Sequence, residues 1–407
     1  MQNLQGCQPP LHGVRVADFT WALAGPYATM LLAFLGAEVI KIESSVRLDL
    51  SRRMYMAPGA KPEEINKATS FSDFNHNKLG ITLNLQQPHA IDLVRQIISV
   101  SDVVVDNFSP GVMERLGLGY PTLRSLRPDI VMVSSSAMGG TGPESSYVGY
   151  APTFNSLSGV GFLTGYPDRP PGEIRTGVDL RVGATIAFAV LVAVNCRLRT
   201  GRGQYVDVSA REAMSALVGD SFLEYTIGHR VPVRDGNRDR IMAPHGCYRC
   251  KGEDKWVTIA VGTEEEWAAF CRAIGGPPWT RNSKFQDQHS RWLHQEEMDK
   301  HVEAWTSGRS PYEVTALLQR EGVAAFPSMS SEDLYKDPHL REREAYGEVT
   351  HPEIGRRIVF RPPFRLPKTP ARITTAGPLL GEHSSYVFSE LLGLQNLAEL
   401  QERKVVI

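Results

Sequence analysis

Short apolar runs alternate with helical patterns over the first 140 residues of the chain. Each run is four to six residues long, and turn residues follow it, as is typical of buried strands. Strand, helix and strand at this spacing predict βαβ units and a parallel sheet with both faces covered. The predicted strands are 14–19, 38–43, 81–85, 103–106 and 130–134, with helices over 24–35 and 88–99. The expected fold class is therefore α/β, with a Rossmann-like parallel-sheet domain.

The pattern changes further along the chain and predicts three regions. Residues 140–180 are rich in Gly, Pro, Ser and Tyr, and a loop region of this length is usually functional. An apolar helix from about Leu180 to Leu198 and a strand from Gln204 to Val208 follow. We expect residues 1–225 to form the large α/β domain and 226–335 a smaller α+β domain. Residues 336–407 are expected to form an extended basic strap (352–374) and a C-terminal helix (385–392) that return to the large domain.

Composition and charge exclude several classes of protein. The formal net charge is −1, so the chain lacks the basic field that nucleic-acid binding requires. The most apolar stretch, 184–194, is about half as long as a bilayer-spanning helix and predicts a buried helix. The first residues show no secretory signal pattern, and five irregularly spaced cysteines predict reduced thiols rather than disulfides. We expect a cytoplasmic protein with no membrane, metal or nucleic-acid partner.

The usual nucleotide-binding and hydrolase signatures are absent. The sequence has no GxGxxG after the first strand, and no GxxxxGK[ST], GxSxG or HExxH. Polar turns instead follow the predicted strands, where ligands of parallel sheets gather. The first of these turns opens a helix whose free N–H groups could receive a phosphate or an acyl oxygen. The four polar segments are 18–26, 75–78, 106–111 and 134–143.

Several segments, taken in order, resemble the class III CoA-transferase family. The resemblance covers about residues 11–394, and its order and spacing are more specific than any single piece. The matching segments are LHGVRVADF (11–19), AGP (24–26), LGAEVIKIE (35–43), DNFSPG (106–111), RTGRGQ (199–204) and APHG (243–246). The resemblance implies coenzyme A as cosubstrate, no metal, and an interlocked dimer. The chain would form a homodimer or a heterodimer with a paralogous subunit.

The resemblance assigns the nucleophile to Asp179, which Gly183 follows four residues later. An Asp directly before a helix is also typical of an N-cap, and the two roles are compatible. A carboxylate with a pKa of about 3.9 is an anion at neutral pH and needs no general base. It would attack the thioester to give a mixed anhydride and then an aspartyl-CoA thioester. Gly139, Gly140 and the loops around Gly236 or Gly246 are candidate N–H donors to the oxyanion.

The resemblance also implies contacts with coenzyme A and with the acid. Two departures from the family pattern affect phosphate binding. A basic residue often follows the second strand in the family, whereas this chain has Ser44-Ser45, and Arg47 could take the place of that basic residue. Some members also have a lysine at the position of Ser136. Aromatic and basic residues near Asp179 indicate a bulky, aromatic or dicarboxylic acceptor such as benzylsuccinate, with succinyl-CoA as donor. The alternative is that these aromatics pack in the core and these arginines face solvent. The coenzyme A contacts are Ala22, Leu23, Ala24, Lys78, Asn107, Phe108, Arg115 and Ser136. The substrate contacts are Trp21, Tyr150, Arg175 and Arg181.

Two other functions remain open at this stage. An α-methylacyl-CoA racemase or epimerase shares the fold, but it uses a histidine where this chain has Tyr150, between Gly149 and Ala151. Racemisation needs a proton donor and an acceptor on opposite faces of the α-carbon, so the tyrosine disfavours it. The chain could also be one subunit of a heteromeric transferase whose partner supplies the active nucleophile.

Overall fold

The computed structural model describes residues 8–54, 56, 59–61, 63–174 and 176–407, which form two compact units. The first unit runs up to Gly161 and adds Glu173–Val231 and the chain from Leu340 onwards. The second unit comprises Phe162–Gly172 and Pro232–His339. The short segment belongs to the second unit because the Gly236 N–H donates to the Gly165 carbonyl at 2.9 Å.

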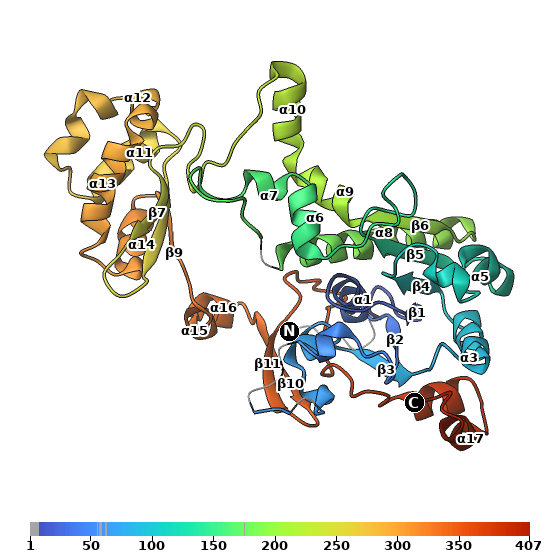
Figure 1. Ribbon diagram of the computed structural model, residues 1–407. Coiled ribbons are helices and arrows are strands. Elements are labelled where there is room, and N and C mark those ends of the chain that lie inside the picture. Colours follow the sequence, from blue (N-terminus) through green and yellow to red (C-terminus); the bar gives the residue numbers. More distant parts are fainter. Residues whose placement is uncertain (1–7, 55, 57–58, 62, 175) are drawn as a thin grey trace. The chain divides into compact units, whose positions relative to one another are not determined.

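The first unit is built on a parallel sheet of six strands in the order β3-β2-β1-β4-β5-β6 (Figure 1). The predicted parallel sheet and the α/β class are confirmed. The strands are rich in β-branched residues, and β4 is buried along its whole length, as expected for a strand covered on both faces. The strands are β1 (Arg15–Asp18), β2 (Glu38–Glu43), β3 (Lys78–Thr82), β4 (Val103–Asp106), β5 (Val131–Ser136) and β6 (Tyr205–Ser209).

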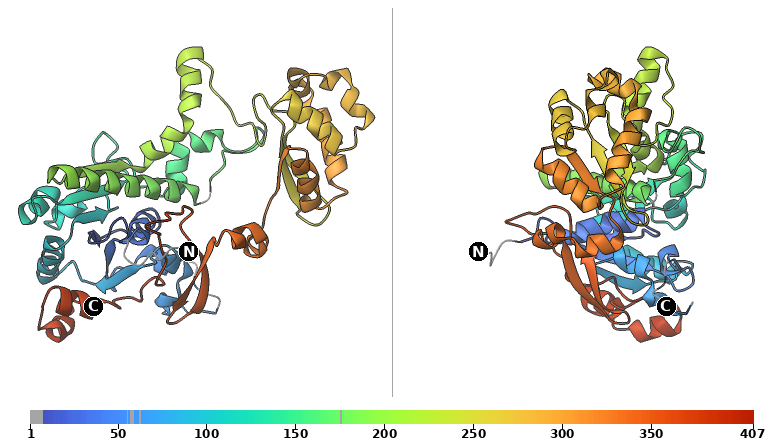
Figure 2. Two further views of the ribbon diagram at one scale, coloured as in Figure 1. Left: turned by 180° about the vertical axis from the view of Figure 1, so that it is seen from behind. Right: turned by 90° about the vertical axis from the view of Figure 1, so that its left-hand side faces the viewer.

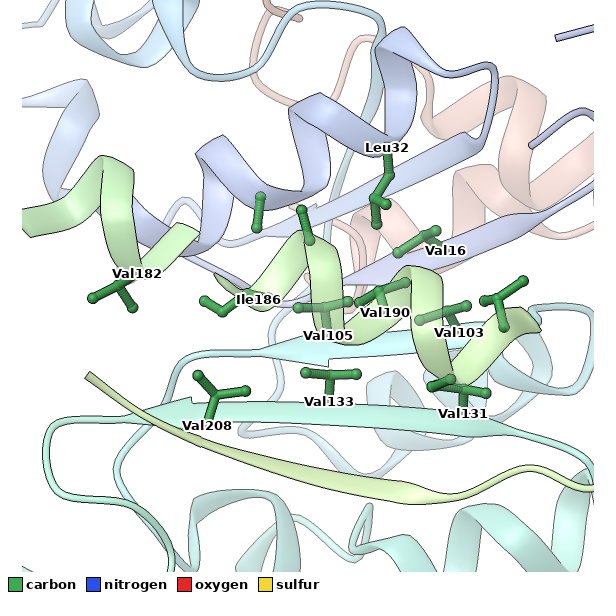
Figure 3. Close-up of a cluster of buried hydrophobic side chains, with 14 of the residues drawn as sticks. Val16, Leu32, Val103, Val105, Val131, Val133, Val182, Ile186, Val190 and Val208 are labelled. Carbon is green, nitrogen blue, oxygen red and sulfur yellow. The ribbon is translucent and has the colours of Figure 1, made fainter. Parts of the chain in front are cut away.

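Successive residues of the inner strands supply two separate hydrophobic cores, one on each face of the sheet. Val16, Val105 and Val133 point to one face, where they pack against Leu32 and against Val182, Ile186 and Val190 (Figure 3). Ala17, Val104 and Met132 point to the other face. The helices on the first face are α1 (Ala24–Phe34), α8 (Gly177–Thr200) and α9 (Ala210–Ser215). The elements on the second face are α3 (Pro88–Ser99), α4 (Val112–Arg115), α5 (Tyr120–Leu126), η6 (Tyr386–Leu391) and α17 (Leu397–Glu402).

Helix α8 is long and apolar enough to cross a membrane, judged by length and composition alone. Its inner stripe of valine and isoleucine is buried against the sheet, so it is the core helix that the sequence predicts. It begins at Gly177, one turn earlier than expected, and ends at Gly201, whose φ of +70° gives a left-handed C-cap.

The chain from Leu340 onwards packs with the first unit. The Asn77 side chain binds the backbone of Arg372, Thr374 and Thr375, and the Val405 carbonyl accepts the Asn84 N–H at 2.9 Å (red segment, Figures 1 and 2). The strap is not extended throughout, because β10 (Tyr346–His351) and β11 (Gly355–Phe360) form an antiparallel hairpin. The predicted helix over 385–392 is a π-helix, η6, and it is followed by α17, which the sequence did not predict. The remaining elements of this unit are η1 (Leu50–Arg52), η2 (Ile65–Lys67), α2 (Thr69–Asp73), α6 (Ala151–Leu157), η3 (Ala216–Val218) and α10 (Gly219–Gly228).

The second unit has its own core around a three-stranded antiparallel sheet. Val257, Ile259 and Ala325 face helices on one side of this sheet. Its elements are β7 (His245–Arg249), β8 (Trp256–Ala260), β9 (Ala324–Pro327), α11 (Glu264–Ala273), η4 (Pro278–Arg281), η5 (Ser283–Phe285), α12 (Gln288–Leu293), α13 (Gln295–Thr306), α14 (Pro311–Arg320) and α15 (Ser331–Lys336). Helices α7 (Val160–Leu163) and α16 (Pro338–Glu342) lie at the boundaries between the units.

Candidate active site

The strand order reverses between β1 and β4, and the loops that follow these two strands meet at the carboxyl edge of the sheet. Open parallel sheets bind ligands at this switch point. The side chain of Asn107, after β4, forms two hydrogen bonds with the backbone of Trp21, after β1. The Trp21 N–H donates to Asn107 Oδ1, and Asn107 Nδ2 donates to the Trp21 carbonyl, both at 2.9 Å. Asn107 therefore joins the two loops.

Helix α1 begins at this edge with uncapped N–H groups. Its N-cap is Leu23, whose side chain makes no capping hydrogen bond. Within the described chain, no acceptor meets the N–H groups of Leu23 and Ala24. Such groups carry the positive end of the helix dipole and can receive a developing negative charge. The preceding residue, Ala22, has a left-handed φ of +62°.

Gly183 brings α8 against this end of α1. A Cβ atom at Gly183 would lie 2.5 Å from the Ala24 carbonyl oxygen, so only glycine allows this close approach. Asp179 lies one helical turn earlier on the same face, about 6 Å along the axis. Val182 and Ile186 continue this face into the core (Figure 3). Asp179 thus stands at the end of the buried stripe, beside the first turn of α1.

Asp179 is not an N-cap, contrary to expectation. The N-cap of α8 is Thr176, which has a φ of +63° and makes no side-chain capping bond. Burial, and secondarily the negative charge of Glu173, raise the pKa of Asp179 to about 6. This value is above the pKa of about 3.9 of an ordinary aspartate, and the carboxylate is still mostly ionised at neutral pH. The Asp179 carboxylate accepts no hydrogen bond within the described chain. Desolvation without compensating donors leaves a reactive anion.

Lys78, which the resemblance implies as a coenzyme A contact, is turned into the fold in this structure. Its side chain is fully buried, and its ammonium lies 3.1 Å from Asp18 Oδ2. It also donates to the Pro26 carbonyl, Thr29 Oγ1 and Asn75 Oδ1, at 2.7 to 2.9 Å. Burial, only partly offset by Asp18, lowers the pKa of Lys78 to about 8. The residue holds β1, α1 and β3 together.

Two other cations remain exposed on the loops at this edge. Arg115 ends α4, after β4, and forms no ion pair within the described residues. Arg47 lies 4.6 Å from the centre of the Trp21 ring, which Phe108 also contacts edge-on. Arg47 thus adjoins the first turn, as its proposed substitution for a basic residue after β2 requires. Ser136 ends β5, and its buried Oγ has no hydrogen-bond partner within the described chain.

One of the candidate oxyanion donors, Gly140, is already occupied. The Gly140 N–H donates to Asp207 Oδ2 at 2.7 Å, so it is not free to stabilise an oxyanion. The cause is the neighbouring strand β6, which places Asp207 opposite Ser134 of β5. Gly139 has a φ of +86° and lies in the same turn.

The predicted substrate residues do not form one group. Arg181 lies two residues after Asp179, about 200° around the helix, and its Nε contacts the Ala213 carbonyl at 3.5 Å. It therefore does not flank the carboxylate. Tyr150 precedes α6 and is 70% exposed, so it is not a core residue. Trp21 adjoins the first turn, and Arg175 lies outside the described residues.

The family resemblance assigns no role to Asp49 or to Asp106, although Asp106 begins one of the matching segments. Asp49 accepts the Ala22 N–H at 2.9 Å, and Asp106 accepts a hydrogen bond from Ser134 Oγ at 2.6 Å. Burial raises the pKa of Asp106 to about 6. The only local signal was the Asp-x-Ser spacing of Asp49 and Ser51, which is typical of a capped turn. This spacing does not indicate that Asp49 binds the Ala22 N–H, which lies 27 positions earlier in the sequence.

Known proteins resemble this chain over nearly its whole length. The model of CoA-transferase family III matches residues 11–384. A succinyl-CoA–D-citramalate CoA-transferase of Chloroflexus aurantiacus is 31% identical over 98% of both chains. The beta subunit of a succinyl-CoA–L-malate CoA-transferase of the same organism is 30% identical, also over 98% of both. The crystal structure of a CAIB/BAIF family protein from Brucella suis, 27% identical, superposes with a TM-score of 0.85 over 94% of this chain and 100% of that chain.

Proposed function

Since the chain belongs to CoA-transferase family III, we propose that it moves coenzyme A from succinyl-CoA to a dicarboxylic acid, with Asp179 as covalent nucleophile. The observation that carries this proposal is the state of Asp179. The carboxylate is desolvated, accepts no hydrogen bond from the described residues, and lies one helical turn from Gly183, which packs against the first turn of α1. A carboxylate in this state is a stronger nucleophile than a hydrated one and is largely ionised at neutral pH.

The reaction divides into two reversible exchanges. An Asp179 oxygen attacks the thioester carbonyl, the carbon–sulfur bond breaks, and a mixed anhydride and the coenzyme A thiolate form. The thiolate then attacks the aspartyl carbonyl and releases succinate, leaving an aspartyl-CoA thioester. The acceptor carboxylate repeats these steps in reverse. The bonds that break and form are of similar energy, so the exchange requires no ATP.

Each step passes through an oxyanion that needs hydrogen-bond donors. The N–H groups of Leu23 and Ala24 are the best candidates, because no described residue accepts a hydrogen bond from them and Gly183 packs α8 against the Ala24 carbonyl in the same turn. One such donor is worth about 3 kcal/mol in a site from which water is excluded. The Gly140 N–H is a poorer candidate because Asp207 already accepts from it.

The acceptor class follows from the relatives. Citramalate and malate, which appear in the names of the two Chloroflexus proteins, are both dicarboxylic acids, and succinyl-CoA appears in both names. Arg115 and Arg47 are exposed at the site edge, where they could pair with nucleotide phosphates or with a distal carboxylate. These observations favour a dicarboxylate over an aromatic monocarboxylic acid.

We propose that the working molecule is a dimer. Helix α10 buries none of its residues within the described chain, although Phe222 and Ile227 are large and apolar. Exposed apolar helices of this kind usually pack against a partner. One of the two Chloroflexus relatives, the L-malate CoA-transferase, is a beta subunit, so the partner could be a paralogous chain rather than a second copy.

A substrate screen tests the proposal. The purified chain, without ATP, is incubated with succinyl-CoA and single acids, and new CoA esters are separated by chromatography. We expect esters of dicarboxylic acids, including citramalate, malate and benzylsuccinate. Transfer only to short aliphatic monocarboxylates would refute the acceptor class. Deuteration of a chiral acyl-CoA at its α-carbon in heavy water, without any transfer, would instead indicate a racemase. Activity that requires an added paralogue would indicate a heteromeric enzyme.

A further inference from the structure

The turn between β1 and α1 is held by side chains at nearly every backbone polar group. The Thr20 N–H donates to Asp18 Oδ1 at 2.9 Å, and the Thr20 carbonyl accepts from Lys41 Nζ. Asn107 binds both the N–H and the carbonyl of Trp21. The next N–H, that of Ala22, donates to Asp49 Oδ1. These hydrogen bonds restrict the backbone of Thr20, Trp21 and Ala22 to one conformation.

That conformation is unfavourable for the residue at its end. Ala22 has a φ of +62°, a left-handed value that costs an alanine free energy because Cβ approaches the backbone. Such strain persists only where the surroundings enforce it, and it clusters at functional sites. The Ala22 N–H has one acceptor in the described chain, Asp49 Oδ1 at 2.9 Å. Asp49 therefore enforces the strained geometry.

Asp49 is itself fixed on every side. It is 4% exposed, and its Oδ1 also accepts from the N–H and the hydroxyl of Ser51, at 2.9 and 2.8 Å. Its Oδ2 lies 3.3 Å from Lys41 Nζ, and Lys41 is the residue that binds the Thr20 carbonyl. The Asp49–Lys41 pair thus binds the turn at two backbone groups, the Ala22 N–H and the Thr20 carbonyl.

The orientation of this turn decides where the first N–H groups of α1 point. Leu23 and Ala24 directly follow the strained residue, and the Ala24 carbonyl touches Gly183, one turn from Asp179. We infer that Asp49 is a positioning residue of the transferase reaction, which holds Ala22 so that the opening N–H groups of α1 face the acyl oxygen at Asp179. The inference rests on the proposed function. Asp49 is too deeply buried to touch substrate, so its effect passes through the turn.

The competing explanation is that Asp49 only stabilises the fold and has no effect on the reaction. Three variants separate the two explanations. Asp49→Ala removes the hydrogen-bond acceptor of the Ala22 N–H, whereas Asp49→Asn keeps an oxygen in position to accept from the Ala22 N–H. The double variant Asp49→Ala/Ala22→Gly removes the hold and also the strain, because glycine adopts a φ of +62° without penalty. It therefore remains informative if Asp49→Ala alone does not fold.

The experiment measures kcat and KM for succinyl-CoA alongside the fraction folded from circular dichroism. We expect kcat of Asp49→Ala and of the double variant to fall about 100-fold, as for loss of an oxyanion donor, with KM changed less than about threefold. Asp49→Asn should recover most of this loss. Asp102→Asn is the matched control, since Asp102 is mostly buried and pairs with Arg127 and Arg197 at the amino end of β4. It should lower the melting temperature and leave kcat unchanged.

Two results would overturn the inference. One is a folded Asp49→Ala protein, or a folded double variant, with kcat within about threefold of the wild type. The other is an Asp49→Asn variant as slow as Asp49→Ala, because charge and not the hydrogen bond to Ala22 would then matter. Failure of the wild-type chain to transfer coenzyme A at all would contradict the proposed function instead.

Discussion

Asp179 and Asp18 show how the surroundings of a buried carboxylate decide its role. Burial raises the pKa of Asp18 too, but the charges of Lys78 and Lys41 and two hydroxyl donors outweigh burial and lower this pKa overall. Asp18 is therefore a permanent structural anion. Burial and Glu173 raise the pKa of Asp179 to about 6, and no cation or donor among the described residues opposes them. Its negative charge is left available for attack on an acyl group.

The raised pKa predicts the pH dependence of the enzyme. Only the ionised carboxylate attacks, so kcat/KM for succinyl-CoA should be level above pH 7 and fall about tenfold per pH unit below about pH 6. Replacing Glu173 by Gln removes a nearby negative charge, so the pKa of Asp179 should fall and the inflection should move to lower pH. The matched control is Asp92→Asn, an exposed acid on α3, on the other face of the sheet. An inflection that does not move in Glu173→Gln would contradict this electrostatic account.

Lys78 and Arg115 should behave in opposite ways when replaced. Lys78→Met leaves Asp18 buried without its partner and should destabilise the protein by about 3–5 kcal/mol in urea unfolding. Arg115→Ala should change stability by less than about 0.5 kcal/mol. It should raise KM for succinyl-CoA about threefold to fivefold, equivalent to losing a surface ion pair of about 1 kcal/mol. A stable Lys78→Met protein with a raised KM would show that Lys78 binds phosphate after all.

The sequence locates residues better than it assigns their environments. It places Asn107 and the 22–24 turn at one edge, because strand ends in a parallel sheet share that edge, and it identifies Asp179 only through the family resemblance. It cannot show that Lys78 turns inward to Asp18, since the two are 60 positions apart. It likewise cannot show that Asp207 occupies the Gly140 N–H, which depends on the pairing of β5 with β6.

Among the elements, the contact between α1 and α8 has the most direct bearing on the site. Gly183 allows the α8 backbone to lie against the Ala24 carbonyl. The valines and isoleucine on the inner face of α8 then fix its rotation against β4 and β5 (Figure 3). The position of Asp179 is therefore set by packing along the whole helix and not by a local cap.

A single methyl group at Gly183 tests this contact. In Gly183→Ala the new Cβ would lie 2.5 Å from the Ala24 oxygen and 2.9 Å from Tyr27, so α8 must move away. We expect a loss of about 1–3 kcal/mol of stability, as for overpacked cores. We also expect kcat to fall about 100-fold, because misplacement by about 1 Å can cost that much. The control is Gly219→Ala at the start of α10, where nothing lies within 4 Å. Equal kcat values for the two folded variants would show that the contact does not position Asp179.

Periodic elements were predicted from the sequence, and elements defined by distant pairing were not. The strands of the large sheet and helices α1, α3 and α8 carry clear apolar patterns. The β10–β11 hairpin was read as an extended strap, because only Val349 and Val359 among its residues are apolar and buried in a core. The segment 162–172 joins the second unit through contacts that no local pattern reveals.

For the whole molecule, the open apolar face of α10 leads to a prediction about assembly. Phe222, Leu223 and Ile227 are 67%, 57% and 79% exposed and lie on one side of the helix. Sedimentation of the wild-type chain should show a dimer at micromolar concentration. Ile227→Asp should shift it towards monomer, because a charge cannot be buried in an apolar contact. Ser221→Asp, on the other side of α10, is the control and should stay dimeric. A wild-type chain that sediments as a monomer would contradict the proposal.

The most direct test of the central claim is to trap the enzyme-bound acyl group. The chain is incubated with succinyl-CoA, treated with hydroxylamine, and digested for peptide mass spectrometry. The proposed mechanism predicts an aspartyl hydroxamate at Asp179. It also predicts that the folded Asp179→Asn protein forms none and transfers coenzyme A at least about 1,000-fold more slowly. A hydroxamate at another residue, or near-normal turnover by Asp179→Asn, would contradict the account.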